Sequence, residues 1–173
     1  MKILLDGDGC VFDMLSAVQQ IQPAFCPEAV IDYNMEHSDC GISQAEFLQI
    51  ASRPETLLVQ GLYPGVKKDV ADLLKLGQVI GWSGVSPANR EGRIRQFQEL
   101  GVCQVDAEKQ FHPDADVVID DAVDQLMRFG QKTQKFLITR RYNQDQVLPG
   151  DIERVKDLRE VIERLTERNI HRI

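Results

Sequence analysis

Short apolar runs that alternate with helical segments constrain the fold more than any other feature of the sequence. The first run, Lys2–Leu5, stops at the acidic and glycine-rich stretch Asp6-Gly7-Asp8-Gly9. An apolar run of this length, bounded by a turn, is typical of a strand buried on both faces of a parallel sheet. Similar runs recur along the chain and predict further strands over residues 78–83, 102–105, 116–121 and 135–139.

Amphipathic segments between these runs predict helices. Residues 66–76 carry an apolar stripe at helical spacing, and Gly77 follows as the expected C-terminal cap residue. Asp151 is placed to cap a last helix, whose apolar face would begin with Ile152 and Val155. Alternating strands and helices indicate an α/β fold, which we expect to be a three-layer sandwich around a mainly parallel, Rossmann-like sheet.

The segment from Val11 to about Gln60 shows no strand pattern and contains several helical signals. Ser43 is placed to cap a helix, and Glu46 follows three residues later as its capping-box partner. We therefore expect two parts: a core domain formed by residues 1–13 and 61–173, and a small helical cap inserted at residues 14–60.

Composition excludes some classes of partner. The net charge of −7 and the pI near 5.0 argue against binding to polymeric nucleic acid or to an anionic membrane, because no basic stripe is present. The N-terminal apolar run is too short for a signal peptide or a membrane span. The four cysteines form no Cys-x-x-Cys pair and have no histidine at zinc-ligand spacing. We expect reduced thiols in a cytoplasmic protein.

Acidic and hydroxyl residues stand at the carboxyl ends of three predicted strands. Asp6 and Asp8 follow the first strand, Ser83 ends the second, and Asp120 and Asp121 end a later one. Ligands of open α/β sheets bind at this edge, and residues two apart on a strand point the same way. Crowded carboxylates repel one another, which favours a bound cation or a raised pKa. The pattern predicts metal-assisted chemistry on an anionic substrate.

These residues resemble the motifs of the haloacid dehalogenase-like (HAD) hydrolases, in order and spacing, over nearly the whole chain. Asp6-Gly7-Asp8-Gly9 is similar to the first motif of that superfamily. Ser83 and Lys109 stand where the superfamily has its Ser/Thr and its Lys, and Val118-Ile119-Asp120-Asp121 is similar to its acidic fourth motif. The resemblance implies a HAD-like core with a helical cap.

A narrower resemblance is to the 5′(3′)-deoxyribonucleotidases and their bacterial and phage relatives. It rests on Asp6–Asp13 read as D-x-D-G-x-x-x-D, on Tyr63-Pro64-Gly65, on Ile119-Asp120-Asp121 and on Arg140-Arg141-Tyr142-Asn143. The chain departs from this family at Trp82-Ser83-Gly84, where the family usually has Thr-Ser-Pro.

The superfamily resemblance implies a chemical role for each acid. Asp6 would attack phosphorus and form an aspartyl-phosphate, and Asp8 would protonate the leaving alkoxide and later activate water. Mg²⁺ would bind the Asp6 carboxylate, the Asp8 backbone carbonyl and an acid from Asp120 or Asp121, since hard oxygen ligands suit this ion. The sequence leaves the choice between Asp120 and Asp121 open.

The same resemblance implies the binding of a small phosphorylated substrate. Ser83 and Lys109 would hold the phosphate oxygens, and the cap at residues 14–60 would exclude water and select the leaving group. The nucleotidase resemblance favours a (deoxy)nucleoside monophosphate, although the cap offers only Phe25, Tyr33 and Phe47 as aromatic residues for a base.

Other functions remain open at this stage. The chain could be a phosphatase for another small metabolite or, against its acidic balance, for a terminal phosphate on nucleic acid. It could also be a regulatory or binding domain that keeps the metal site without turnover, because a fold does not imply an activity. Asp13 is as well placed to cap the first helix as to touch substrate, and we expect Trp82 and Cys10 to be buried core residues.

Overall fold

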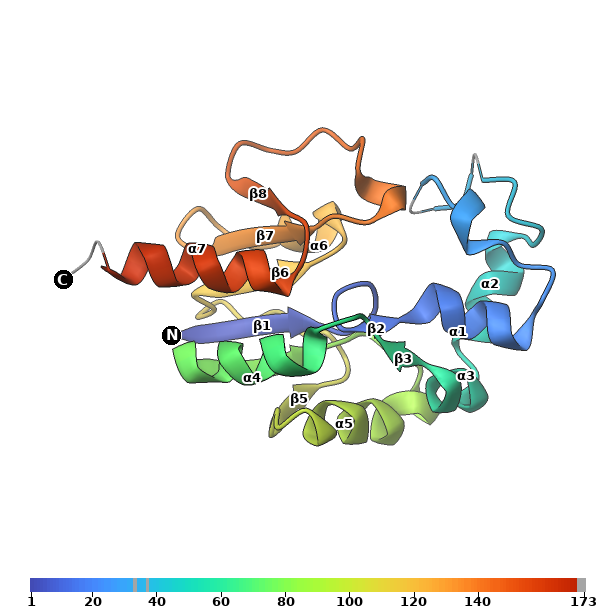
Figure 1. Cartoon of the computed structure of the whole chain (residues 1–173), viewed down its shortest axis with the longest axis horizontal. Coiled ribbons are helices and arrows are strands. Elements are labelled where there is room, and N and C mark those ends of the chain that lie inside the picture. Colours follow the sequence, from blue (N-terminus) through green and yellow to red (C-terminus); the bar gives the residue numbers. More distant parts are fainter. Residues whose placement is uncertain (33, 37, 171–173) are drawn as a thin grey trace.

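The computed structural model describes residues 1–32, 34–36 and 38–170. Its main sheet has six strands, all parallel, in the order β5-β4-β1-β6-β7-β8. The strands are β1 (Lys2–Asp6), β4 (Gln78–Trp82), β5 (Gln104–Asp106), β6 (Val117–Asp120), β7 (Gln134–Ile138) and β8 (Ile152–Val155). The chain builds outward from β1 in both directions, so the carboxyl end of β1 is the switch point at which open α/β sheets bind ligands (Figure 1).

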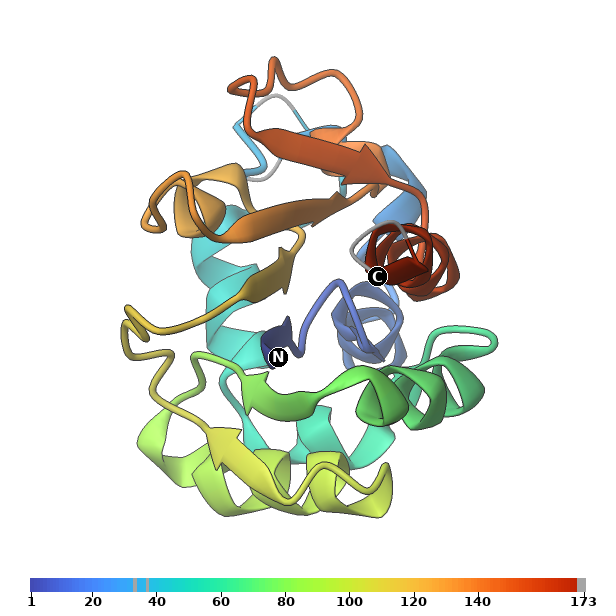
Figure 2. The ribbon, with the colours of Figure 1, turned by 90° about the vertical axis from the view of Figure 1, so that its left-hand side faces the viewer.

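Helices cover both faces of this sheet, as the sequence predicts (Figure 2). Ile3 and Leu5 of β1 belong to a core shared with α4 (Val66–Leu76), α5 (Arg90–Glu99) and α7 (Leu158–Ile170). Leu4 points to the opposite face, into a second core with α6 (Val123–Leu126). Alternate residues of one strand are thus buried in different cores, which explains why the run is apolar throughout.

The last part of the chain differs from the sequence-based expectation. Ile152–Val155 is not the start of a helix but forms β8, which pairs with β7 at the sheet edge. The spacing of Ile152 and Val155 fits a helical stripe, but the pairing with β7 outweighs it. Asp151 caps no helix and pairs instead with Lys135. The helix starts later, at Leu158, where Asp157 accepts a hydrogen bond from the Glu160 backbone nitrogen.

Gly77 ends α4 for a reason other than the predicted one. Its φ of 176° is extended backbone, so it does not form the left-handed cap that the sequence suggests. A Cβ at this position would lie 2.2 Å from the Met1 carbonyl oxygen. The close approach of the N-terminal strand, and not the torsion angle, therefore requires glycine here.

The segment at residues 14–60 forms a helical body of its own. It contains α1 (Met14–Ile21), α2 (Gln44–Ala51), α3 (Pro54–Val59) and a 3₁₀ turn at Pro27–Ala29. The capping box of Ser43 and Glu46 is confirmed, and Asp13 caps α1 through the Ser16 backbone nitrogen. A separate core holds this body together; it includes Val18, Phe25, Val30, Met35, Cys40 and Ile50. Tyr33 lies outside the described residues.

A short two-stranded ribbon lies where this body joins the core, although the sequence shows no strand pattern there. β2 (Phe12–Asp13) pairs antiparallel with β3 (Gly61–Leu62), so the two segments that connect the core with the helical body lie side by side. In Figure 1 the strands of the main sheet point toward the helical body, which lies beyond their carboxyl ends.

Two further expectations concern the chain as a whole. Among the described residues, no helix has the length and apolar character needed to cross a membrane. The four cysteines, all within the described residues, form no disulfide, and Cys10 and Cys40 are buried.

Candidate active site

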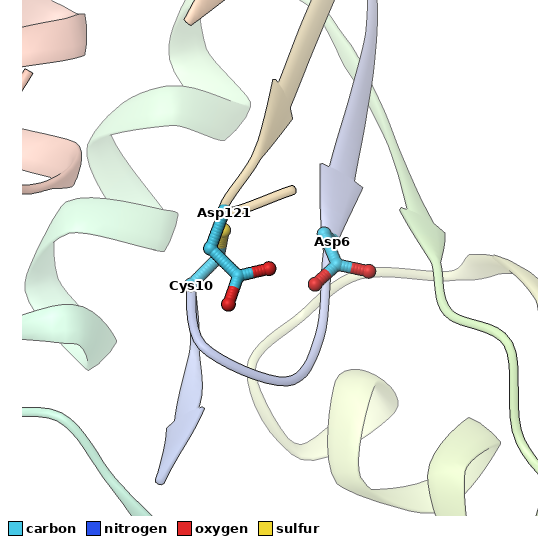
Figure 3. A group of neighbouring side chains, drawn as sticks. All are labelled: Asp6, Cys10 and Asp121. Atoms are coloured by element: carbon cyan, nitrogen blue, oxygen red, sulfur yellow. The ribbon is translucent and has the colours of Figure 1, made fainter. Parts of the chain in front are cut away.

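The loop after β1 folds back on itself and brings two strand ends together. The backbone nitrogens of Val11 and Phe12 both donate to the Gly7 carbonyl oxygen, each at 2.9 Å. Gly9 adopts a left-handed φ of 79°, and a Cβ there would lie 1.9 Å from Asp121 Oδ2. Glycine at this position therefore allows the loop of β1 to lie against the end of β6 (Figure 3).

This contact makes Gly9 a sensitive position. In Gly9→Ala the new methyl group must displace the Asp121 carboxylate, and the left-handed backbone becomes strained. We expect a loss of about 1–3 kcal/mol of stability and weaker Mg²⁺ binding, measured by thermal unfolding and by calorimetric titration. Gly150→Ala is the matched control, since a Cβ at Gly150 meets no atom within 4 Å. Equal Mg²⁺ affinity in both variants would argue against Asp121, one of the two candidate acids, as a ligand of the ion.

The predicted site residues converge at one edge of the sheet. Asp6, Asp8, Ser83, Lys109 and Asp121 all line a single cavity. Lys109 Nζ lies 2.6 Å from Asp6 Oδ1 and 2.8 Å from Asp120 Oδ2, so one ammonium bridges two strand ends. Asp120 itself is fully buried behind the cavity, held by Lys109 and by the Ala122 backbone nitrogen.

Lys109 is held in an unusual conformation. Its φ of 54° lies in the left-handed region, which side-chain-bearing residues seldom adopt. The Arg128 guanidinium donates to the Lys109 carbonyl oxygen at 3.2 and 3.3 Å, and the Lys109 ammonium lies 4.8 Å from the centre of the Trp82 ring. Trp82 is fully buried, as predicted. Strained backbone of this kind is typical of functional sites, where surrounding contacts must hold the residue in place.

The site places three buried acids, Asp6, Asp120 and Asp121, around a single lysine. Burial raises the pKa of Asp121 from 3.8 to about 7, and the nearby Asp6 carboxylate adds to this shift. Burial also raises the pKa values of Asp6 and Asp120, although the Lys109 ammonium opposes both shifts. Burial alone would lower the pKa of Lys109, but Asp6 and Asp120 outweigh it and hold that pKa above its usual value. Such a site favours an additional cation.

The donor set identifies where a cation would bind. One ligand atom each from Asp6, Cys10 and Asp121 lies within 4.8 Å of the others (Figure 3). The Cys10 thiol is a soft donor, whereas carboxylate oxygens are the hard ligands that suit Mg²⁺, and burial also raises the pKa of this thiol well above its usual value. Two carboxylates beside an open cavity fit Mg²⁺, which keeps several waters. Asp121 lines that cavity and Asp120 does not, so the geometry favours Asp121 as the second ligand.

Three residues that the sequence analysis does not name as site residues contact the acids. Tyr142 donates a hydrogen bond to Asp121 Oδ2. Arg93 Nη2 and Gln60 Nε2 both donate to Asp8 Oδ1, at 2.7 and 2.6 Å. Tyr142 lies within the Arg140–Asn143 stretch that the nucleotidase resemblance singles out. No local signal marks Arg93 or Gln60, which are separated from Asp8 by many residues.

The cavity has a volume of about 320 Å³ and extends from the acids to the helical body. Its far wall is mainly apolar, formed by Met14, Leu15, Val30, Met35, Phe47 and Leu48. Asn34 and Gln44 add two carboxamides to this wall, and Tyr63 and Tyr142 lie nearer the acids. Phe25, by contrast, is buried in the core of the helical body and does not line the cavity.

Comparison with known proteins identifies a fold but no close sequence relative. No family model and no curated protein sequence matches the chain. The putative HAD-hydrolase YfnB from Bacillus subtilis, bound to magnesium, has a TM-score of 0.59 and 12% identity over 95% of this chain and 97% of that one. The HAD phosphatase from Thermococcus onnurineus has a TM-score of 0.52 and 15% identity over 95% and 98%.

A third similar structure is that of a dehalogenase and not of a phosphatase. The L-2-haloacid dehalogenase from Xanthobacter autotrophicus, with chloropropionic acid covalently bound, has a TM-score of 0.56 and 11% identity over 96% of this chain and 98% of that one. The chain thus has the α/β fold of the HAD hydrolases, as its motifs predict. Because this fold is shared by phosphatases and dehalogenases, the reaction must be argued from the site.

Proposed function

We propose that the protein is a Mg²⁺-dependent phosphomonoester hydrolase that acts through an aspartyl-phosphate. The observation that carries the proposal is the convergence of Asp6, Asp121, Lys109 and Ser83 on one cavity. An Asp6 oxygen attacks phosphorus while the ester P–O bond breaks, and Asp8 gives its proton to the leaving oxygen. Water then attacks the aspartyl-phosphate, Asp8 takes a proton from it, and phosphate leaves with Asp6 regenerated.

Each residue beside Asp6 has a physical task in this scheme. Asp6 and Asp121 would hold the ion, together with the Asp8 backbone carbonyl. When bound, Mg²⁺ offsets the charge that otherwise keeps an anionic nucleophile from an anionic phosphate. Lys109 and Ser83 bind the phosphate oxygens, where the charge distribution changes in the transition state. Their electrostatic stabilisation of this charge is stronger because both side chains are largely shielded from water. Asp120 keeps the Lys109 ammonium in place.

The charges around the cavity restrict which leaving groups the site can bind. Lys109 is the only cationic side chain among the described residues that line it, and the phosphate engages this ammonium. A second anionic group on the substrate would therefore lie among apolar or acidic side chains without a partner, which is costly. The lining favours a neutral, largely flat leaving group, with Phe47 to pack against and Asn34 and Gln44 to hydrogen-bond. These features support a (deoxy)nucleoside monophosphate as the substrate.

A panel of phosphomonoesters tests both parts of the proposal. We expect Mg²⁺-dependent hydrolysis of p-nitrophenyl phosphate, and faster hydrolysis of deoxynucleoside monophosphates than of sugar phosphates or phosphoglycolate. Preference for a sugar phosphate would mean that the substrate is another small metabolite and not a nucleotide. Absence of turnover across the panel, with Mg²⁺ still binding, would indicate a non-catalytic binding domain.

The role of Asp8 predicts a separation of turnover from metal binding. Asp8→Asn removes the transferable proton but keeps the backbone carbonyl, so Mg²⁺ affinity should stay within a few fold of the wild type. Turnover should fall by about 10²–10⁴-fold, the usual contribution of general acid–base catalysis. Steady-state kinetics and calorimetric titration measure the two quantities. A large loss of Mg²⁺ affinity would mean that the Asp8 carboxylate is a metal ligand instead.

A further inference from the structure

Asp8 is held by two donors that come from different parts of the chain. Arg93, on α5 of the core, is fully buried, and its Nη2 lies 2.7 Å from Asp8 Oδ1. Gln60 follows α3 of the helical body, and its Nε2 lies 2.6 Å from the same oxygen. The Arg93 guanidinium also stacks on Phe12, 4.6 Å from the ring centre, which fixes its plane.

Both donors use the same carboxylate oxygen, and this has a chemical consequence. Oδ1 accepts two N–H hydrogen bonds, so a proton on Asp8 must reside on Oδ2, which accepts no hydrogen bond from the described residues. The Asp8 side chain is 32% exposed and lines the cavity, whereas Arg93 is out of contact with solvent. The two donors are thus on one oxygen of the carboxyl group, and the other oxygen is left for a transferable proton.

The position of the Gln60 side chain depends on the contacts between the helical body and the core. Gln96 Nε2, on α5, donates to the Leu57 carbonyl oxygen at 3.0 Å, and Asn89 Nδ2 donates to the Ser52 carbonyl oxygen at 3.0 Å. The first hydrogen bond joins α3 to the helix that carries Arg93, and the second joins the end of α2 to the residue before that helix. One of the two donors to Asp8 is therefore tied to the docking of the helical body.

We propose that Arg93 and Gln60 are positioning residues that orient Asp8, so that its transferable proton faces the leaving group. This inference rests on the proposed function, since it takes Asp8 as the general acid. A residue that acts through the general acid matters most when the leaving group is a poor one, because a stable leaving anion needs no proton.

The test compares kcat/KM for p-nitrophenyl phosphate, which has a good leaving group, with that for n-butyl phosphate, which has a poor one. Gln60→Leu and Arg93→Lys should raise the ratio of the two values at least about tenfold over the wild type, with Asp8→Asn as the upper limit. Gln98→Leu is the matched control, because it makes the same kind of substitution at an exposed position of α5.

The outcomes separate the two proposals. If both esters slow equally in Gln60→Leu, the residue supports the fold alone and the inference is wrong. Should Arg93→Lys fail to fold, Gln60→Leu decides the matter by itself, since its side chain is not fully buried. A wild-type protein that hydrolyses neither ester would overturn the proposed function and, with it, the role given to Asp8.

Discussion

Asp6→Asn is expected to abolish hydrolysis while leaving the metal-free protein at least as stable as the wild type. Loss of a nucleophile that forms a covalent intermediate lowers turnover by about 10³-fold or more. Burial raises the pKa of Asp6, so its ionised carboxylate is less favourable in the folded chain than in the unfolded one. Asparagine has nearly the same shape and no charge, so it removes this cost together with the activity.

Opposite effects on activity and stability distinguish a catalytic carboxylate from a structural one. We expect the midpoint of thermal unfolding at pH 8 without Mg²⁺ to stay equal or rise in Asp6→Asn, and Mg²⁺ to raise it less than in the wild type. Asp13→Asn is the matched control: it changes an acid seven residues later, and asparagine also caps helices. Turnover retained in Asp6→Asn would exclude Asp6 as the nucleophile.

The candidate site could be predicted because its main residues end strands. Asp6, Ser83 and Asp120 each follow an apolar run, and parallel strands bring their carboxyl ends to one edge. The sequence does not distinguish Asp121 from Asp120 as a metal ligand, because both acids lie at the end of the same strand. Contacts in the folded chain separate their surroundings: the loop at Gly9 and Tyr142 lie against Asp121, whereas Lys109 and the Ala122 backbone nitrogen hold Asp120.

Other features depend on contacts between distant residues and leave no local pattern. Arg93 lies on a helix rich in charged residues, and only Asp8 and Phe12, far away in the sequence, make its buried position favourable. Ile152–Val155 fits both a strand and a helical stripe, and the exposed edge of β7 decides between them. Tertiary contacts outweigh local propensity at such positions.

Lys109→Met should strongly destabilise the metal-free protein, because it leaves Asp6 and Asp120 without their cation. Removal of one partner from a buried ion pair costs about 3–5 kcal/mol, since the remaining charge stays away from water. Turnover should also fall, because phosphate loses its ammonium ligand. Chemical denaturation measures the stability, and Lys132→Met is the control, since it removes the same charge from an exposed position.

The pH dependence of this loss follows from the pKa values of the acids. Folding raises the pKa of Asp121 from 3.8 to about 7, so the folded chain binds more protons than the unfolded chain between these values. Stability therefore falls as the pH rises through this window. Loss of the Lys109 ammonium strengthens the same trend at Asp6 and Asp120, whose pKa values it otherwise lowers, so the loss in Lys109→Met should be larger at pH 8 than at pH 5. Mg²⁺ should restore part of it at pH 8, because the ion replaces the missing positive charge. A loss independent of both pH and Mg²⁺ would mean that Lys109 acts through packing on Trp82 and not through its charge.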